Sequence, residues 1–356
     1  MGDKVYFMTK TIILGMPKSR NIYLQIIKNL EFYGFEVLYI DNYPEYIKHF
    51  HYQSFKDYLY NQVQKLFFRN YSYKTKLKEK LLLSNAERVL SKRNYEYTII
   101  IRPDLYPVSL LNLMKAHTKN EFIAYQWDGL RRMPCTKETI NLFDRFYVFD
   151  SHDLVDNNYQ NYKLEGITNF YFDMNKPQPV KHNGTIAYYV GTHVSERVAD
   201  IEYCAAELIK NGIQLKFIIP TSNQNKINQY TRSDYFIFGA ENEVDFSKNI
   251  EMLNEIDIIV DFVNPLHNGL SFRFFEALYY QKKLITNNVN VSNYDFYHPD
   301  NILIWHKDDL SQKIKEFLSK PFRPIDDEIV KKYSFGNWIK NILNLSSYDK
   351  IRLPFQ

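Results

Sequence analysis

The chain has 356 residues, a length that suggests two ordinary domains of about 150 residues each. Apolar residues make up 45% of it and charged residues 24%, which is typical of a globular protein and excludes a disordered, collagen-like or coiled-coil chain. The net charge of +4 is too small to indicate a nucleic-acid partner.

The first half of the sequence alternates between strand-like and helix-like segments. After a β-rich run at 11–15 and a turn, apolar residues recur at helical spacing from Ile22 to Leu30, and Gly34 stands where a helix C-cap belongs. Further short apolar runs predict strands at 35–40, 98–101, 122–125 and 145–149. Continuous apolar strands separated by helices are typical of a parallel sheet covered on both faces.

The excess of positive charge is concentrated in residues 65–93, which hold nine basic and two acidic residues. Four of the nine are lysines interleaved with apolar and aromatic side chains: Lys74, Lys76, Lys78 and Lys80. A basic, aromatic segment of this kind suits an anionic membrane surface. The alternative is the solvated face of a helix.

A polar segment at 175–184, with two prolines and a glycine, predicts a linker, and the strand–helix alternation then begins again. Strands are predicted at 186–190, 215–219, 256–262 and 283–286, with helices at 195–210, at 271–280 and around Trp338. We therefore expect an α/β protein with Rossmann-like domains at 1–175 and 176–335, followed by a helix and tail at 336–356. The default ligand site of such a pair is the cleft between the domains.

Three acidic residues, Asp104, Asp128 and Asp150, each follow a predicted strand, where loops of α/β sheets bind ligands. Asp150 is equally suited to cap the next helix. The two cysteines, Cys135 and Cys204, lack the spacing of a metal site or a disulfide framework, and no apolar run approaches the roughly 20 residues of a membrane span. The sequence therefore predicts a reduced, cytoplasmic protein.

The segment 267–278 follows a predicted strand and opens a helix. Gly269 lets the backbone approach a ligand closely, and a helix N-terminus offers free N–H groups to a diphosphate. Arg273 adds a cationic fork suited to phosphate, and Glu276 lies one turn further on the same face, where its carboxylate could accept the hydroxyls of a ribose. The alternative is an ordinary surface ion pair between Arg273 and Glu276.

The stretch Gly269–Asn287 resembles a signature of bacterial GT-B-type glycosyltransferases that assemble capsule, lipopolysaccharide and exopolysaccharide, related to CgeB-like and group 1 sequences. The resemblance extends to 293–302, to 189–193 with Arg197, and to 125–128 and 143–150. It covers roughly residues 96–340 and is strongest in the C-terminal half.

The resemblance implies two Rossmann-like domains facing across a cleft, with the nucleotide-sugar donor on the C-terminal domain and the acceptor on the N-terminal one. It implies that Glu276 holds the ribose and Arg273 the diphosphate. It also implies that the backbone of Gly191 and Thr192, in the turn after the predicted strand at 186–190, approaches the phosphates. Besides Glu276 and Arg273, the motif carries over the following donor-binding residues: Gly191, Thr192, Arg197, Asn268, Gly269, Leu270 and Ser271. Asn268 is a departure, because related retaining enzymes have a glutamate at that position, eight residues before the ribose glutamate.

The sequence has no Asp-x-Asp tripeptide, so no metal is expected, and arginine and helix N–H groups would stabilise the leaving diphosphate. An inverting reaction needs a base for the acceptor hydroxyl. Asp128 is the first candidate and Asp104 the second, while His193 is a candidate for contacting the donor. Each of the three has an alternative role as a turn or capping residue, and a retaining reaction would need no such base.

These observations predict a glycosyltransferase at the inner face of the cytoplasmic membrane, contacting it through 65–93. It would use no cofactor and would transfer a sugar from a nucleotide sugar to a lipid-linked surface oligosaccharide. One alternative is a GT-B nucleotide-sugar epimerase, which needs no acceptor. Another is a non-catalytic subunit that binds the donor or docks a transferase complex to the membrane.

Overall fold

The structure, a computed structural model, describes residues 10–306 and 310–354. These residues form two compact units. The first comprises the described residues up to Lys18, Gly34–Gln126 and Pro134–Phe146, and the second comprises Ser19–Tyr33, Trp127–Met133 and the residues from Tyr147 onward. The predicted linker carries neither helix nor strand from 175 to 185 and lies inside the second unit.

The first sheet has six strands in the order β2-β1-β3-β4-β5-β6, and β1 pairs in parallel with β2 and β3, as β3 does with β4. Its strands are β1 (Lys10–Gly15), β2 (Phe35–Ile40), β3 (Tyr95–Ile101), β4 (Thr118–Gln126), β5 (Arg145–Val148) and β6 (Leu164–Gly166). The five strands predicted in this half are confirmed. Gly34 adopts φ 84° directly after the first helix, as a C-cap glycine does.

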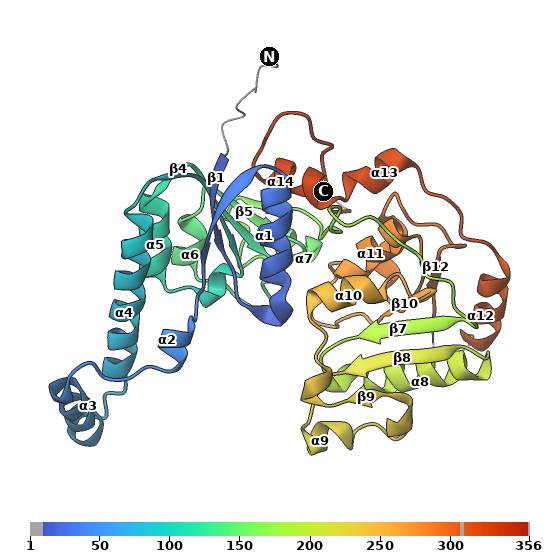
Figure 1. Cartoon of the computed structure of the whole chain (residues 1–356), viewed down its shortest axis with the longest axis horizontal. Helices are drawn as coiled ribbons and strands as arrows, with labels where there is room; N and C mark the ends of the chain where they lie inside the picture. Colours follow the sequence, from blue (N-terminus) through green and yellow to red (C-terminus); the bar gives the residue numbers. More distant parts are fainter. Residues whose placement is uncertain (1–9, 307–309, 355–356) are drawn as a thin grey trace, which may run out of the picture. The chain divides into compact units, whose positions relative to one another are not determined.

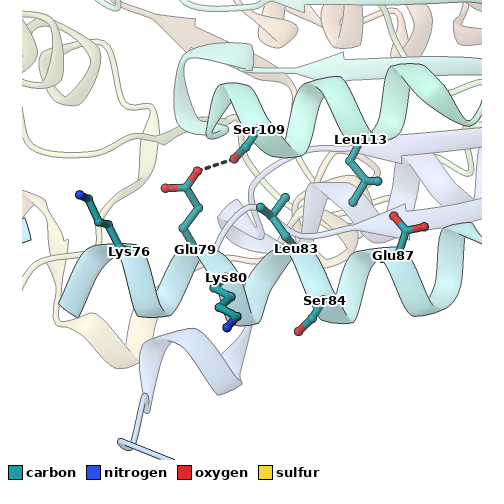
Figure 2. A pocket seen from close by; sticks show the side chains of 8 residues that line it. All are labelled: Lys76, Glu79, Lys80, Leu83, Ser84, Glu87, Ser109 and Leu113. Atoms are coloured by element: carbon teal, nitrogen blue, oxygen red, sulfur yellow. Dashed lines mark hydrogen bonds between the residues drawn. The ribbon is translucent and has the colours of Figure 1, made fainter. Parts of the chain in front are cut away.

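The helices of the first half are α1 (Ile22–Phe32), α2 (Glu45–Lys48), α3 (Phe55–Phe68), α4 (Ser72–Leu90), α5 (Val108–Ala116), α6 (Lys137–Asn141) and α7 (Ser151–Val155). Figure 1 shows α4 and α5 side by side and α3 beyond the end of α4. An open groove of about 770 Å³ lies on α4 and α5. Figure 2 shows the side chains that line it, with Glu79 accepting a hydrogen bond from the Ser109 hydroxyl. Within the described residues, no helix is both long and apolar enough to cross a bilayer.

Helix α3 exposes many of its apolar side chains. Asn61 is its single buried residue, and Phe67, in its last turn, is 77% exposed. The large apolar residues exposed on and just after α3 are Phe55, Tyr58, Leu59, Tyr60, Val63, Leu66, Phe67, Phe68 and Tyr71. A helix with this much exposed apolar surface is unusual for a water-soluble fold.

The second sheet also has six strands, in the order β12-β11-β10-β7-β8-β9, and all of its pairings are parallel. Its strands are β7 (Ile186–Val190), β8 (Gln214–Ile219), β9 (Ile237–Phe238), β10 (Ile258–Asp261), β11 (Lys283–Thr286) and β12 (Ile302–Ile304). The strand order reverses between β7 and β10, which is the switch point where doubly wound sheets bind ligands. Val190 and Asp261 end the two strands at this point.

The helices of this part are α8 (Val198–Lys210), α9 (Gln224–Ile227), α10 (Phe246–Met252), α11 (Phe272–Tyr280), α12 (Leu310–Ser319), α13 (Asp327–Lys332) and α14 (Phe335–Ile342). Figure 1 shows α8 along β7 and β8. The helix predicted from 195 starts as a 3₁₀ turn at Ser195–Arg197 and becomes α-helical at Val198. The final amphipathic helix is α14, whose Trp338 is buried.

Candidate functional site

A cavity of about 240 Å³ lies beside the switch point, and all of its lining residues belong to the second unit. Its polar side chains include Arg20, Asn249, Arg273 and Glu276. Its apolar and aromatic lining consists of Ile22, Trp127, Tyr188, Val190, Val244, Phe246, Leu253, Ile259 and Phe272. An apolar pocket with a few convergent polar groups is the usual form of a small-molecule site.

Glu276 lies in the wall of this cavity and is only 5% exposed. Its Oε1 accepts a hydrogen bond from Asn249 Nδ2 of α10 at 2.9 Å, and Asn249 Oδ1 accepts one from the Tyr188 hydroxyl at 3.0 Å. Burial raises the pKa of Glu276 to about 7, although Arg273 and the Asn249 bond act in the opposite direction. The carboxyl therefore titrates near neutral pH inside a cavity.

Arg273 is bound to the end of β10 and not to Glu276. Its Nη1 lies 3.0 Å from Asp261 Oδ1, its Nη2 donates to the Val190 carbonyl, and its guanidinium lies 5.0 Å from the Tyr189 ring centroid. Burial lowers the pKa of Arg273, but Asp261 and other nearby groups raise it by more, so the net shift is upward. The alternative of a surface ion pair between Arg273 and Glu276 is wrong, because Glu276 is buried and Arg273 pairs with Asp261.

Arg20 also lines the cavity, although no motif in the sequence indicated it. It lies in the turn between β1 and α1, where Arg20 and Asn21 have φ of 45° and 57°, a conformation that few non-glycine residues adopt. Arg20 Nε lies 3.6 Å from Glu243 Oε1, and Nη2 is buried without a hydrogen-bond partner among the described residues. The one sequence signal was its place in a loop that follows a predicted strand.

The predicted phosphate turn after β7 lies outside the cavity lining. A Cβ on Gly191 would overlap the Tyr189 side chain, so this position requires glycine for packing reasons. Arg197 Nε donates to the Val263 carbonyl at 3.0 Å. His193 has Nδ1 at 3.2 Å from the Tyr230 hydroxyl and Nε2 at 3.3 Å from Ser195 Oγ, and burial lowers its pKa. Thr192 is exposed.

The loop 268–270 is held by the residues that follow β5. Asp150 Oδ1 accepts from the His152 backbone N–H at 3.0 Å, as the capping alternative predicts, and its Oδ2 accepts from the Asn268 N–H at 3.0 Å. A Cβ on Gly269 would overlap the Phe149 ring, so packing requires glycine there as well. The Leu270 carbonyl accepts a hydrogen bond from Asn169 Nδ2 at 2.9 Å. Ser271, the N-cap of α11, donates from Oγ to Asp261 Oδ1 at 2.7 Å and lines the 240 Å³ cavity.

The two carboxylates predicted as bases are both in ion pairs. Asp104, in the first unit, is held by Arg102 through Oδ1 at 2.8 Å and Oδ2 at 2.7 Å, and also accepts from Gln126 at 2.9 Å. Asp128, in the second unit, lies 2.9 Å from Arg132 Nη1. Asp128 is also near the His267 imidazole, whose pKa burial lowers.

A second cavity of about 490 Å³ in the same unit borders Asn268 and is lined mainly by polar side chains. Its titratable residues are Arg131, Asp150, His152, Asp153, Asp156 and His267. Burial raises the pKa of Asp153 to about 7, and its Oδ2 accepts from the Leu130 N–H at 2.9 Å. Across residues 10–306 and 310–354, no three His, Cys, Asp or Glu side chains form a group that could hold a metal ion.

Solved structures of low sequence identity share this architecture. A glycosyltransferase from Rickettsia africae superposes with a TM-score of 0.51 and 12% identity, covering 88% of this chain and 89% of the other. A UDP-GlcNAc 2-epimerase from Methanocaldococcus jannaschii gives a TM-score of 0.51 and 13% identity, covering 95% of this chain and 99% of the other. A further UDP-N-acetylglucosamine 2-epimerase gives a TM-score of 0.50 and 10% identity, covering 96% and 98%.

No protein-family model and no curated protein matches the sequence. The structural matches extend over most of both chains, while identities of 10–13% carry the likeness no further than the fold. Two six-stranded sheets with surrounding helices, the second in the doubly wound order, are the architecture that these structures share with the chain. The chain therefore has the GT-B fold of two Rossmann-like domains, as its sequence predicted.

Proposed function

We propose that the chain is a metal-independent glycosyltransferase that takes a sugar from a nucleotide-sugar donor. The observation that carries this proposal is the cavity at the switch point of the second sheet, where buried Glu276 lies with Arg20 and Arg273. A carboxylate accepts two hydroxyl hydrogen bonds, as a ribose offers, and guanidinium groups suit a diphosphate. The fold shared with a glycosyltransferase structure supports the same function.

In this proposal the leaving nucleoside diphosphate is stabilised without a metal. Helix α11 begins at the cavity, and its first N–H groups carry the positive end of the helix dipole. Arginine beside that terminus adds fixed positive charge in a site that excludes much of the water. The turn residues Gly191, Thr192 and Arg197 and the loop residues Asn268, Gly269 and Leu270 keep their proposed place around the donor.

For an inverting reaction we keep Asp128 as the base that takes the proton of the acceptor hydroxyl. Its partner Arg132 is 34% exposed, so the acceptor could displace it. Asp104 and His193 are weaker candidates for the base. Both carboxylate oxygens of Asp104 accept hydrogen bonds from Arg102, and both ring nitrogens of His193 lie within hydrogen-bond distance of a hydroxyl group. A base must present a free lone pair to the hydroxyl in the bound complex.

The acceptor in this proposal is an oligosaccharide of a bacterial capsule, lipopolysaccharide or exopolysaccharide, carried on a lipid at the inner face of the cytoplasmic membrane. The exposed apolar side chains of α3 and the lysines of α4 support the membrane contact. Lys76 and Lys80 are exposed beside the groove on α4. Aromatic side chains that enter the interface and lysines that attract anionic lipids together favour binding at a membrane surface.

A nucleotide-sugar epimerase of the same fold is the second candidate. The observation that favours it is the coverage of the two epimerase structures, which match 95% and 96% of this chain against 88% for the glycosyltransferase. An epimerase would use the same donor cavity and would need no acceptor.

Incubating the purified chain with UDP-GlcNAc and related nucleotide sugars, with and without a lipid-linked acceptor, separates the candidates. A transferase leaves the sugar of the donor unchanged until acceptor is added and then releases the nucleoside diphosphate, in EDTA as in buffer. Inversion at a sugar carbon without acceptor, followed by NMR, contradicts the transferase and supports the epimerase. Binding of donor with no turnover in either arm supports a non-catalytic subunit. Glu276→Ala is the matched inactive control.

A further inference from the structure

The geometry points to Arg20 as the residue that binds the diphosphate of the donor, an inference that rests on the proposed function. Arg273, to which the sequence assigned that role, would instead act as a positioning residue. The inference thus moves the phosphate contact from α11 to the turn between β1 and α1.

The hydrogen-bonding capacity of the two guanidinium groups separates their roles. Arg273 donates from both Nη atoms, to the Asp261 carboxylate and to the Val190 carbonyl, and Asp261 neutralises its charge, so that only its buried Nε lacks a partner among the described residues. Arg20 has a buried Nη2 with no partner among the described residues, and its neighbour Glu243 is 3.6 Å away and 58% exposed. A buried N–H group without an acceptor is costly, and a phosphate oxygen in the cavity would provide one.

The electrostatics of the cavity also favour an anion beside Arg20. Burial lowers the pKa of Arg20, and the positive charge of Arg273 lowers it further. Two guanidinium groups close enough to affect each other repel, and both remain protonated near neutral pH. An anion placed between them and the start of α11 would remove this repulsion.

The backbone at Arg20 has an unusual conformation for a non-glycine residue. Arg20 and Asn21 both have left-handed φ values, which L-residues such as arginine rarely adopt. Segment 19–33 is held against α10 by the hydrogen bond from the Gln25 amide to the Ser247 hydroxyl. Strain maintained by its surroundings is typical of functional positions.

The test compares nucleosides with nucleoside diphosphates, because the contact with Arg20 belongs to the diphosphate alone. Titration calorimetry with uridine, UDP, guanosine and GDP is run on wild type, Arg20→Asn, Arg20→Lys and Arg232→Gln. Asparagine tolerates a left-handed φ well, so Arg20→Asn removes the guanidinium without adding strain. Arg232 is an exposed arginine of the same unit outside the cavity lining and serves as the matched control.

We expect Arg20→Asn to weaken binding of the diphosphate by about 10- to 100-fold while the affinity for the nucleoside changes by less than about twofold. Its melting temperature without ligand should equal or exceed that of wild type. Arg20→Lys should restore part of the loss, and Arg232→Gln should behave as wild type.

Equal loss of nucleoside and diphosphate affinity would overturn the inference and assign Arg20 a structural role. Unchanged diphosphate affinity in Arg20→Asn would overturn it while leaving the proposed function intact. If neither UDP nor GDP binds the wild type, the titration is repeated with dTDP, and if that also fails to bind, the proposed function fails first and the inference fails with it.

Discussion

At the scale of single residues, the cavity removes one carboxyl and most of two guanidinium groups from water, and the fold has to compensate for their desolvation. Arg273 is compensated by Asp261 at 3.0 Å, and Arg20 by the more exposed Glu243 at the longer distance of 3.6 Å. Glu276 receives one hydrogen bond, from Asn249, which is less than an ionised carboxylate can accept. We assign the ligand contacts to these groups, because their hydrogen-bonding capacity is only partly satisfied within the protein.

The raised pKa of Glu276 has a direct consequence for stability. The folded pKa of about 7 lies above the unfolded value of 4.5, so between these values the folded chain holds a proton that the unfolded chain has lost. The contribution of Glu276 to the free energy of unfolding therefore falls as pH rises from 4.5 to 7, by roughly 3 kcal/mol.

Glu276→Gln should remove this dependence. The glutamine retains an acceptor for Asn249 but cannot ionise, so we expect its stability gain over wild type to be larger at pH 8 than at pH 4.5. Urea denaturation at the two pH values measures the difference, and Glu251→Gln, an exposed position on α10, is the control. A stability difference between Glu276→Gln and wild type that is the same at both pH values would contradict a buried, titrating Glu276.

At the scale of elements, α3 is a 14-residue helix with one buried residue, Asn61. Its large apolar side chains are exposed and do not pack into a core, so packing within the first unit does not explain the sequence. Helix α4 adds four lysines within its first nine residues. Together these two helices form the basic, aromatic surface that we propose to contact anionic lipid.

Replacing Leu66 and Phe67 with serine should abolish binding to vesicles that contain phosphatidylglycerol, because both side chains are more than 70% exposed and available for insertion. Lys76→Glu with Lys80→Glu should weaken the same binding and reduce its salt dependence. Phe32→Ser, at a 60% exposed position on α1, is the matched control. Vesicle sedimentation measures all three. Equal binding by the Leu66/Phe67 variant and wild type would exclude α3 as the contact.

At the scale of the whole molecule, the sequence predicted the longer strands well and the short ones poorly. A run such as 98–101 consists of one threonine and three isoleucines, all buried, as is typical of a strand covered on both faces, and its position was clear. The short strands β6, β9 and β12 have two or three residues each and were missed, although β9 and β12 lie in the apolar runs 235–238 and 302–305, which are too short to separate from a loop or a helix turn by pattern alone. The paired arrangement of β7 and β10, which creates the switch point, depends on contacts distant in sequence.

The site was predictable to the extent that it is local in sequence. Glu276 and Ser271 were identified because they stand in one helix and its cap, and both line the cavity. Arg20 could not be found in this way, since it reaches the cavity only because segment 19–33 packs with α10. The commitment of Arg273 to Asp261 likewise depends on tertiary packing and not on the i,i+3 spacing to Glu276.

The central claim is that the cavity around Glu276 binds a nucleotide-sugar donor. The most direct measurement is thermal unfolding of wild type and Glu276→Ala with UDP, GDP, CMP, dTDP and their sugars, because a ligand that binds only the folded chain raises its melting temperature. We predict that one nucleotide class raises the melting temperature of the wild type and that Glu276→Ala loses this shift while remaining folded. No shift with any nucleotide on a folded wild type, or an equal shift in Glu276→Ala, would contradict the claim.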